Sequence, residues 1–209
     1  MKRLLHISAS PRKDRSRSAM VADHFRARLQ RRFPSLEIEQ LNLFDVDLPP
    51  FDQAVVDARY HVLGGGKVDP AQAKPWQDLQ AWADQFLSFD SYLIAAPMWN
   101  FGIPYPLKHY IDIVTQPGMT FRNDHDGNVE GLAKGRRAFI VAASAMPFGS
   151  VAELDGLDFQ LSYLKAWLGF IGVTDVKAVR VAGTFGSEDA VAEAMSRAYA
   201  DAALLANTL

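Results

Sequence analysis

The stretch HISASPRKDRSRSAM, residues 6–20, decides how the first part of this chain folds. It begins inside RLLHIS, residues 3–8, a nearly continuous apolar run that is typical of a parallel strand covered on both faces. Hydroxyl and guanidinium groups follow before a helix begins: Ser8, Ser10, Arg12, Arg15, Ser16, Arg17 and Ser18. The pattern allows two interpretations, a solvated loop that ends in a helix cap or a cradle for a phosphate group.

The composition limits the kind of protein that this can be. The chain has 209 residues, of which 49% are hydrophobic and 22% charged, so we expect a single domain, 1–209, with a substantial core. A formal net charge of −2 gives no basic excess that would attract nucleic acid or an anionic membrane. The absence of cysteine excludes disulfides, thiolate metal sites and a catalytic thiol.

Signals for metal binding and for targeting are missing from the sequence. The five histidines do not have the spacing of a zinc motif, and we expect no metal site. No apolar run approaches the roughly 18 residues of a membrane span, and the first residues lack the apolar core of a signal peptide. We therefore expect a cytoplasmic protein that does not bind membranes.

Strand and helix patterns alternate along the chain. Apolar runs predict strands at 3–8, 36–43, 91–97, 137–144 and 176–184. Helices are predicted between them, the first from Val21, Phe25 and Leu29, which recur every four residues before Pro34. Further helix patterns cover 71–89, 106–114, 155–168 and the segment from Ser187. This alternation predicts an α/β fold, a doubly wound five-stranded parallel sheet with helices on both faces.

Two segments interrupt the alternation. Residues 45–75 contain Pro49, Pro50 and three successive glycines, and we expect a long insertion with some helix there. Residues 119–132 form a second excursion, with a turn predicted at Asp126-Gly127.

The segment after the first strand is a candidate phosphate loop. It contains neither G-x-G-x-x-G nor G-x-x-x-x-G-K-[ST], which would indicate a dinucleotide or a nucleoside triphosphate. It offers hydroxyls that run into a helix N-terminus, where free amides and the helix dipole favour an anion. Ser10, Ser16 and Ser18, with the amide of Arg17, could enclose a monophosphate. The alternative is that Ser16 or Ser18 only caps the helix.

The segments after two later strands are candidate ring-binding loops. In APMWNFGIPYPLKHYID, residues 96–112, aromatic rings and an amide on a proline-stiffened loop suit a flat heteroaromatic ring. These residues are Met98, Trp99, Asn100 and Phe101. In AASAMPFGS, residues 142–150, Ser144 could line the other rim of the ring. Hydrophobic core in the first segment and an ordinary loop in the second are the alternatives.

A phosphate loop after strand one and a ring loop after strand three match the flavodoxin-like sheet, of order 2-1-3-4-5, in which FMN lies at the switch point. At these residues the chain resembles the FMN-dependent NADH-azoreductases. The resemblance is nearly full length and rests on six motifs: S-x-S at the first helix, APMWNF, PLKHYID, GMTFR, EGLAKGRRA and WLGFIGVTDV.

The resemblance implies a set of site residues. Those that would hold the FMN phosphate are Ser10, Ser16, Arg17 and Ser18. Those that would lie along the isoalloxazine ring are Met98, Trp99, Asn100 and Phe101, and Ser144 would begin a third contacting loop. Phe121 and Phe170 resemble the aromatics that line the substrate side of the flavin in such dimers. We therefore expect a homodimer with each flavin at the interface.

The resemblance also implies the activity. An oxidoreductase of this kind transfers two electrons per turnover from NADH or NADPH, through the flavin, to quinones and azo compounds by a ping-pong mechanism. No side chain is expected to act as a catalytic group, and His109 is expected to be a packed or solvated helix residue. The chain departs from the family at SAMPFG, which puts contacts of Ala145, Met146 and Pro147 in question, and at Asn123, where a tyrosine is common.

Other functions compete with this interpretation. One is a quinone reductase or general flavin reductase for which azo compounds are not true substrates. Another is a flavodoxin-type one-electron carrier, and a third is a redox-sensing interaction module. The loop sequences MWNFGIPYP and SAMPFGS contain no carboxylate, and three arginines, Arg12, Arg15 and Arg17, lie at the phosphate loop. This charge pattern makes an anionic reduced flavin easier to form and favours an enzyme over a carrier.

Overall fold

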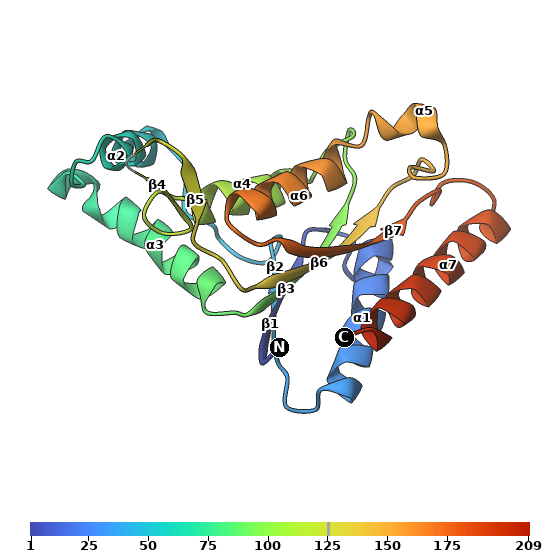
Figure 1. Ribbon diagram of the computed structural model, residues 1–209. Helices are drawn as coiled ribbons and strands as arrows, with labels where there is room; N and C mark the ends of the chain where they lie inside the picture. The colour runs from blue at the N-terminus through green and yellow to red at the C-terminus, as the bar shows by residue number, and fades with distance from the viewer. Residues whose placement is uncertain (125) are drawn as a thin grey trace.

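A five-stranded parallel sheet forms the centre of the protein (Figure 1). The computed structural model describes residues 1–124 and 126–209. The strands are β1 (Arg3–Ser8), β2 (Glu37–Asn42), β3 (Ser91–Pro97), β6 (Arg137–Ala143) and β7 (Asp175–Val181). Their order in the sheet is β2-β1-β3-β6-β7, so the predicted order 2-1-3-4-5 is confirmed.

Helices cover both faces of the sheet, as predicted. The helices α1 (Arg17–Arg32) and α7 (Glu188–Asn207) lie side by side on one face (Figure 1). The other face is covered by α3 (Ala73–Leu87), α4 (Tyr105–Val114) and α6 (Phe159–Phe170). Leu4 of β1 packs in the core under α1 and α7, whereas its neighbour Leu5 packs in the core on the opposite face. This division follows from the alternation of side chains along a strand.

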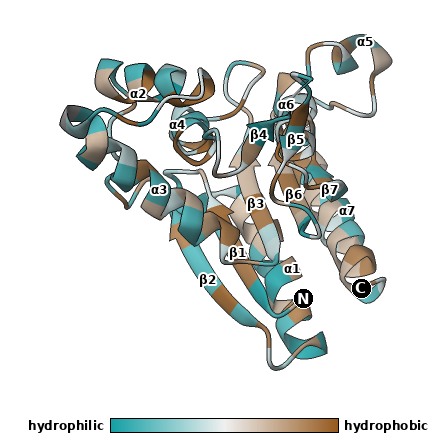
Figure 2. Ribbon diagram, turned by 60° about the vertical axis from the view of Figure 1, so that its left-hand side comes forward, coloured by the Kyte–Doolittle hydropathy of each residue, from teal (hydrophilic) through white to brown (hydrophobic). Residues whose placement is uncertain are grey.

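The central strands are buried at nearly every position, which explains why their sequences are continuous apolar runs. In β3 only the last residue is not buried, and in β6 only the first. The edge strand β2 has a single buried residue, Leu41. Figure 2 shows the difference as brown along the central strands and teal bands along β2.

The two predicted excursions contain short elements of their own. Residues 45–75 include α2 (Gln53–Leu63) and the 3-10 turn η2 (Pro70–Gln72). In the second excursion, β4 (Phe121–Asn123) pairs antiparallel with β5 (Val129–Gly131), and Gly127 between them has a φ of +82°. The remaining elements are η1 (Lys13–Arg15) before α1 and α5 (Ala152–Asp155) before α6.

The described part of the chain has no helix with the length and apolar character needed to cross a bilayer. Its longest helix, α7, places alanines against the sheet and charged residues outward.

A histidine lies in the middle of the buried strand β1. His6 is 3% exposed, and within the described residues neither of its ring nitrogens has a hydrogen-bond partner. Burial lowers the pKa of His6 to about 4, and Asp23 and Arg26 act on it in opposite directions. The ring is therefore neutral at physiological pH in the folded protein, and in the unfolded chain it titrates near its ordinary pKa of 6.5.

We predict that His6 makes the fold sensitive to mild acid. Because its pKa is lower in the folded state, the unfolded chain binds more protons between pH 6.5 and pH 4, and stability falls as the pH falls through that range. Between pH 7 and pH 5 the loss from this residue is about 2 kcal/mol. Urea unfolding at the two pH values should therefore show a smaller difference for His6→Leu than for the wild type. An equal difference in both proteins would contradict the prediction.

Candidate functional site

The carboxyl ends of four strands enclose a cleft of about 280 Å³ at one edge of the sheet. It lies where the chain leaves β1 toward α1 on one face and leaves β3 toward α4 on the other. Seven of the residues predicted from sequence line it together: Ser10, Ser16, Arg17, Ser18, Met98, Trp99 and Ser144. The loops after β1, β3 and β6 therefore meet as expected for a switch point.

The phosphate loop presents buried hydroxyls at the start of α1. The hydroxyl of Ser16 accepts a long hydrogen bond from the amide of Ala19, 3.4 Å, and lies 3.1 Å from that of Ser18. Ser10, Ser16 and Ser18 are all at most 3% exposed although they line the cleft. Ser16 thus does cap the helix, as the alternative interpretation predicted. The first-turn amides of a helix have no partner within it and remain available to an anion.

Positive charge gathers at this end of the cleft. The guanidinium of Arg17 donates a 2.5 Å hydrogen bond to the carbonyl of Thr184, which ties the start of α1 to the loop after β7. Arg12 also lines the cleft and is exposed, whereas Lys13 is paired with Asp45 at 3.1 Å. Of the described residues, none that lines the cleft is acidic.

The ring loop after β3 contains a tight turn with strained backbone. Trp99 and Gly102 exchange two 3.0 Å backbone hydrogen bonds, and between them Asn100 and Phe101 have φ angles of +47° and +68°. Positive φ at both central residues is the type I′ geometry, which Asn tolerates and Phe does not favour. The turn places the side chain of Phe101, which is 42% exposed, beyond the cleft. Within a single chain, therefore, neither Asn100 nor Phe101 lines the cleft.

Aromatic neighbours fix the ring of Trp99 at the mouth of the cleft. Its centroid lies 6.0 Å from that of Phe44 and 6.3 Å from that of Tyr105. The amide of Met98 donates to the carbonyl of Ala143 at 2.6 Å, which joins this loop to the end of β6. One flat wall of the cleft is therefore built from the Met98–Trp99 pair.

The loop after β6 is folded by its own serine. The hydroxyl of Ser144 donates to the carbonyl of Met146 at 2.8 Å, and the carbonyl of Ser144 accepts from the hydroxyl of Thr184 at 2.9 Å. Ala145 lines the cleft, whereas Met146 and Pro147 are exposed and do not line it.

The sequence analysis missed the fourth loop, which contributes Thr184 and Phe185 to the cleft. Two glycines flank these residues, with φ of +74° at Gly183 and +156° at Gly186, and the ring of Phe185 is 87% exposed. The predicted strand 176–184 ran three residues past the observed end of β7 at Val181 and therefore included Thr184. The only signal for a loop was the sequence GTFGS, residues 183–187, which lies at the same edge of the sheet as the other three loops.

Phe121 and Phe170 contact each other outside the cleft. Their ring centroids are 4.9 Å apart, and Phe121 is buried, 4% exposed, beneath Phe170, which is 40% exposed. Phe170 is the last residue of α6, whose second residue, Gln160, bonds to the end of β3 behind the cleft, and a helix of this length spans about 18 Å. Within one chain, these two aromatics and the cleft lie at opposite ends of α6.

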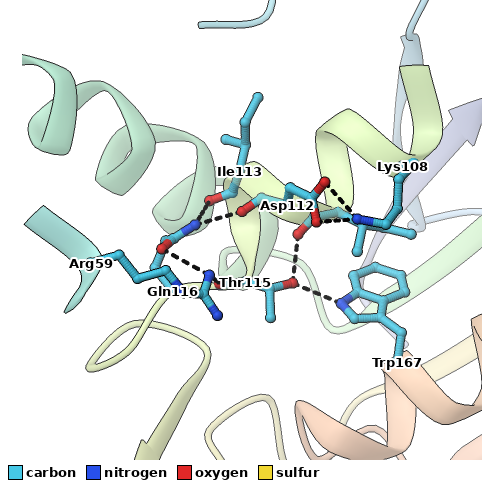
Figure 3. A network of polar contacts seen from close by, with 8 residues as sticks. Arg59, Lys108, Asp112, Ile113, Thr115, Gln116 and Trp167 are labelled. Carbon is cyan, nitrogen blue, oxygen red and sulfur yellow. Dashed lines mark hydrogen bonds and ion pairs between the residues drawn. The ribbon is translucent and has the colours of Figure 1, made fainter. Parts of the chain in front are cut away.

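A polar network fixes the surroundings of these aromatics (Figure 3). Arg59 of α2 donates to the carbonyl of Thr115 at 2.7 Å and to Oε1 of Gln116 at 3.2 Å. The indole of Trp167 in α6 donates to the hydroxyl of Thr115 at 2.9 Å. The network holds α2 and α6 to the end of α4 around a second hollow of about 340 Å³, which Arg59 and Phe170 both line.

The remaining candidates have structural roles or lie apart. His109 of α4 bonds through Nε2 to the carbonyl of Pro49 at 2.9 Å, so it is a packed helix residue, as expected. Asn123 is exposed at the hairpin and pairs with Val129.

These features define a class of protein, an open α/β sheet with a cleft at its switch point that suits a phosphate-bearing aromatic ligand. Residues 2–204 match the family described as having a flavodoxin-like fold, and the chain belongs to that family.

Relatives that cover nearly the whole chain agree with this assignment. A protein of Ruegeria pomeroyi named FMN-dependent NADH:quinone oxidoreductase is 40% identical over 189 residues, 90% of this chain and 93% of the relative. A protein of Nitratidesulfovibrio vulgaris with the same name is 41% identical over 196 residues, 93% of this chain and 92% of the relative. The solved structure of an FMN-dependent NADH-azoreductase from Bacillus anthracis in complex with FMN is 30% identical, with a TM-score of 0.82, and covers 99% of this chain and 100% of that one.

We predict that strain at Phe101 reverses the usual ranking of alanine and glycine. Both Phe101→Ala and Phe101→Gly remove a ring that is 42% exposed, but only glycine relaxes at a φ of +68°. A left-handed conformation costs an L-residue roughly 1–2 kcal/mol, which exceeds the extra flexibility of glycine in the unfolded chain. Chemical unfolding should show the glycine variant to be about 1 kcal/mol more stable than the alanine variant. A more stable alanine variant would show that the turn is not strained.

Proposed function

We propose that this protein is an FMN-dependent oxidoreductase that passes electrons from NADH or NADPH to quinones and azo compounds. The observation that carries the proposal is the meeting, in one cleft at the switch point, of a buried serine loop and an aromatic loop. The names of the relatives support FMN, NADH and quinones, and the name of the structural neighbour supports azo compounds as further acceptors.

The donor set of the cleft fits FMN. A monophosphate suits the hydroxyls of Ser10, Ser16 and Ser18 and the free amides at the start of α1, with Arg12 and Arg17 beside them. A flat ring suits the gap between the Met98–Trp99 wall and the loop that begins at Ser144. FMN, when bound, supplies the electron transfer itself, and the protein supplies position and electrostatics.

The charge of the cleft favours an enzyme over a one-electron carrier. With arginines at the phosphate end and no acidic residue among the described lining residues, the cleft stabilises negative charge on a bound ligand. The exposed edge of Trp99 leaves one side of the ring site open to a second molecule.

The decisive experiment adds NADH and NADPH, separately and without oxygen, to the purified yellow protein. Direct bleaching of the flavin, followed by recovery of colour with quinones or azo dyes, is the expected result, and the rates rank both donors and acceptors. A flavin that neither nicotinamide bleaches would favour the carrier. FAD instead of FMN after denaturation, or no flavin and no FMN affinity, would end the proposal.

We further propose a homodimer in which Phe170, backed by Phe121, covers the ring site of the other copy. Two observations support it: Phe170 is 40% exposed, and it lies at the far end of α6 from the cleft of its own chain. Other large apolar side chains are also exposed, among them Phe159 at the start of α6 and Phe185 at the cleft, and exposed apolar patches mark interfaces. Sedimentation at micromolar concentration should show a species of twice the 23.2 kDa chain mass. A species of one chain mass alone would contradict the proposal.

We predict that the serine hydroxyls contribute directly to FMN affinity. Ser16→Ala combined with Ser18→Ala removes two buried groups at the start of α1 and should weaken FMN binding by roughly 1–3 kcal/mol. Titration of the flavin-free protein with FMN, followed by fluorescence, measures the change. Asp52→Ala is the control, because it removes the cap of α2 away from the cleft and should alter stability but not affinity. Unchanged affinity in the serine variant would place the phosphate elsewhere.

A further inference from the structure

Six residues before and at the start of α6, residues 155–160, contact both ring loops from behind. We call this segment the bracket. Its apolar side chains point outward, because Leu157 is 41% exposed and Phe159 is 57% exposed. Two of its three polar side chains point inward, because Asp158 is 6% exposed and Gln160 is 1% exposed, whereas Asp155 lies at the surface. The bracket is therefore held in place by polar contacts of defined geometry, which is the reverse of ordinary packing.

Gln160 reaches the end of β3. Its Nε2 donates a buried 3.1 Å hydrogen bond to the carbonyl of Ala96, two residues before Met98. The next residue, Pro97, has no N–H and cannot donate to a neighbouring strand. The end of β3 is paired with β6, where Pro97 lies opposite Ala143 and the amide of Met98 donates a 2.6 Å bond to the carbonyl of Ala143. The Gln160 contact adds a bond from α6 to this pairing.

Asp155 reaches the loop on the opposite rim, and Asp158 is bonded to Arg180 beneath that loop. The carboxylate of Asp155 accepts the amide of Gly149 at 2.7 Å. Asp158 caps α6 through the amides of Gln160 and Leu161, and its second oxygen accepts from Arg180 of β7 at 2.5 Å. Arg180 passes directly under Gly149, where an added Cβ would lie 3.0 Å from its Cδ.

The bracket thus joins the two rims of the ring site through one short, rigid segment. Outward movement of α6 would strain the bond to the Ala96 carbonyl on one side and the bond to the Gly149 amide on the other. An aromatic ring bound between two walls is sensitive to the distance between them, because dispersion contact falls steeply when a gap opens by even 0.5–1 Å.

We propose that Gln160, braced by the Asp158–Arg180 pair, is a positioning residue that sets the gap between the two ring loops. The inference rests on the proposed function, since the ligand whose ring fills the gap is FMN. Gln160 does not line the cleft and acts through the Ala96 carbonyl. Its loss should therefore alter how the ring is held without removing any group that touches the ligand.

The test compares two substitutions on contacts of the same strand. Gln160→Met keeps the shape of the side chain and removes the bond to Ala96. Tyr92→Phe is the matched control, because it also removes one buried hydrogen bond made by β3. Tyr92 lies at the opposite end of β3 from the cleft, and its hydroxyl donates a 3.0 Å bond to the carbonyl of Phe86 in α3. Each protein is titrated with FMN, and the absorption spectrum of the bound flavin and the melting temperature without FMN are measured.

For Gln160→Met we expect FMN affinity to fall about tenfold, the effect of one buried hydrogen bond, together with a shifted flavin spectrum. Tyr92→Phe should lower the melting temperature to a similar extent and keep the affinity within about twofold. Equal affinity and spectra in wild type and Gln160→Met would overturn the inference while the proposed function stands. A wild type that does not bind FMN would overturn both.

A second variant guards against misfolding of the first. Arg180→Met removes the ion pair from the partner that is 37% exposed, and the 5% exposed carboxylate of Asp158 keeps the amides of Gln160 and Leu161 as hydrogen-bond donors. It should weaken FMN binding by about threefold and shift the spectrum in the same direction as Gln160→Met. A shift in melting temperature alone, with the affinity and spectrum of the wild type, would assign the bracket a purely structural role.

Discussion

Parallel pairing of β1 with β3 is the constraint on which the cleft depends. Ser8 lies opposite Ala95, and the amide of Ala9 extends the ladder to the carbonyl of Ala95 at 2.9 Å. Both strands therefore end at the same height, and their chains leave toward opposite faces of the sheet, to α1 and to α4. No side chain of the sheet fills the space between two segments that diverge in this way, so a ligand can enter it.

The four loops at this edge are held to one another mostly by bonds to backbone oxygens. Arg17 and Gln160 donate to the carbonyls of Thr184 and Ala96, and Thr184 itself donates to that of Ser144. A backbone carbonyl oxygen changes position only when the backbone itself moves. Side chains that donate to such oxygens therefore hold the four loops in fixed positions relative to one another, as one rigid frame. A preorganised frame loses less entropy when it binds a ligand than four independent loops would.

The fold was predictable from sequence because buried parallel strands are read directly from apolar runs, and β3 was placed at its observed ends. The loops after β1, β3 and β6, which line the cleft, were predicted to meet because each follows such a run. Thr184 and Phe185 were missed, since a loop of glycines and one aromatic has no pattern that separates it from a surface turn. The positive φ of Phe101 was also invisible, because neither central position of its turn, Asn100 or Phe101, is the glycine that marks such turns. Neither spacing nor periodicity in the sequence predicts the contact between Phe121 and Phe170, because it joins a hairpin to a distant helix.

The arginines of the candidate phosphate loop affect the rate at which a phosphate-bearing molecule associates with the protein. A protein of net charge −2 repels anions at long range, yet Arg12 and Arg17 attract them close to the cleft. At physiological ionic strength the Debye length is about 8 Å, so this attraction reaches little beyond the mouth. Added salt should therefore slow the arrival of a phosphate-bearing molecule, while its residence time depends on the buried hydroxyls, which mobile ions do not reach. Different groups of atoms within one short loop therefore control how fast a phosphate-bearing molecule arrives and how long it stays bound.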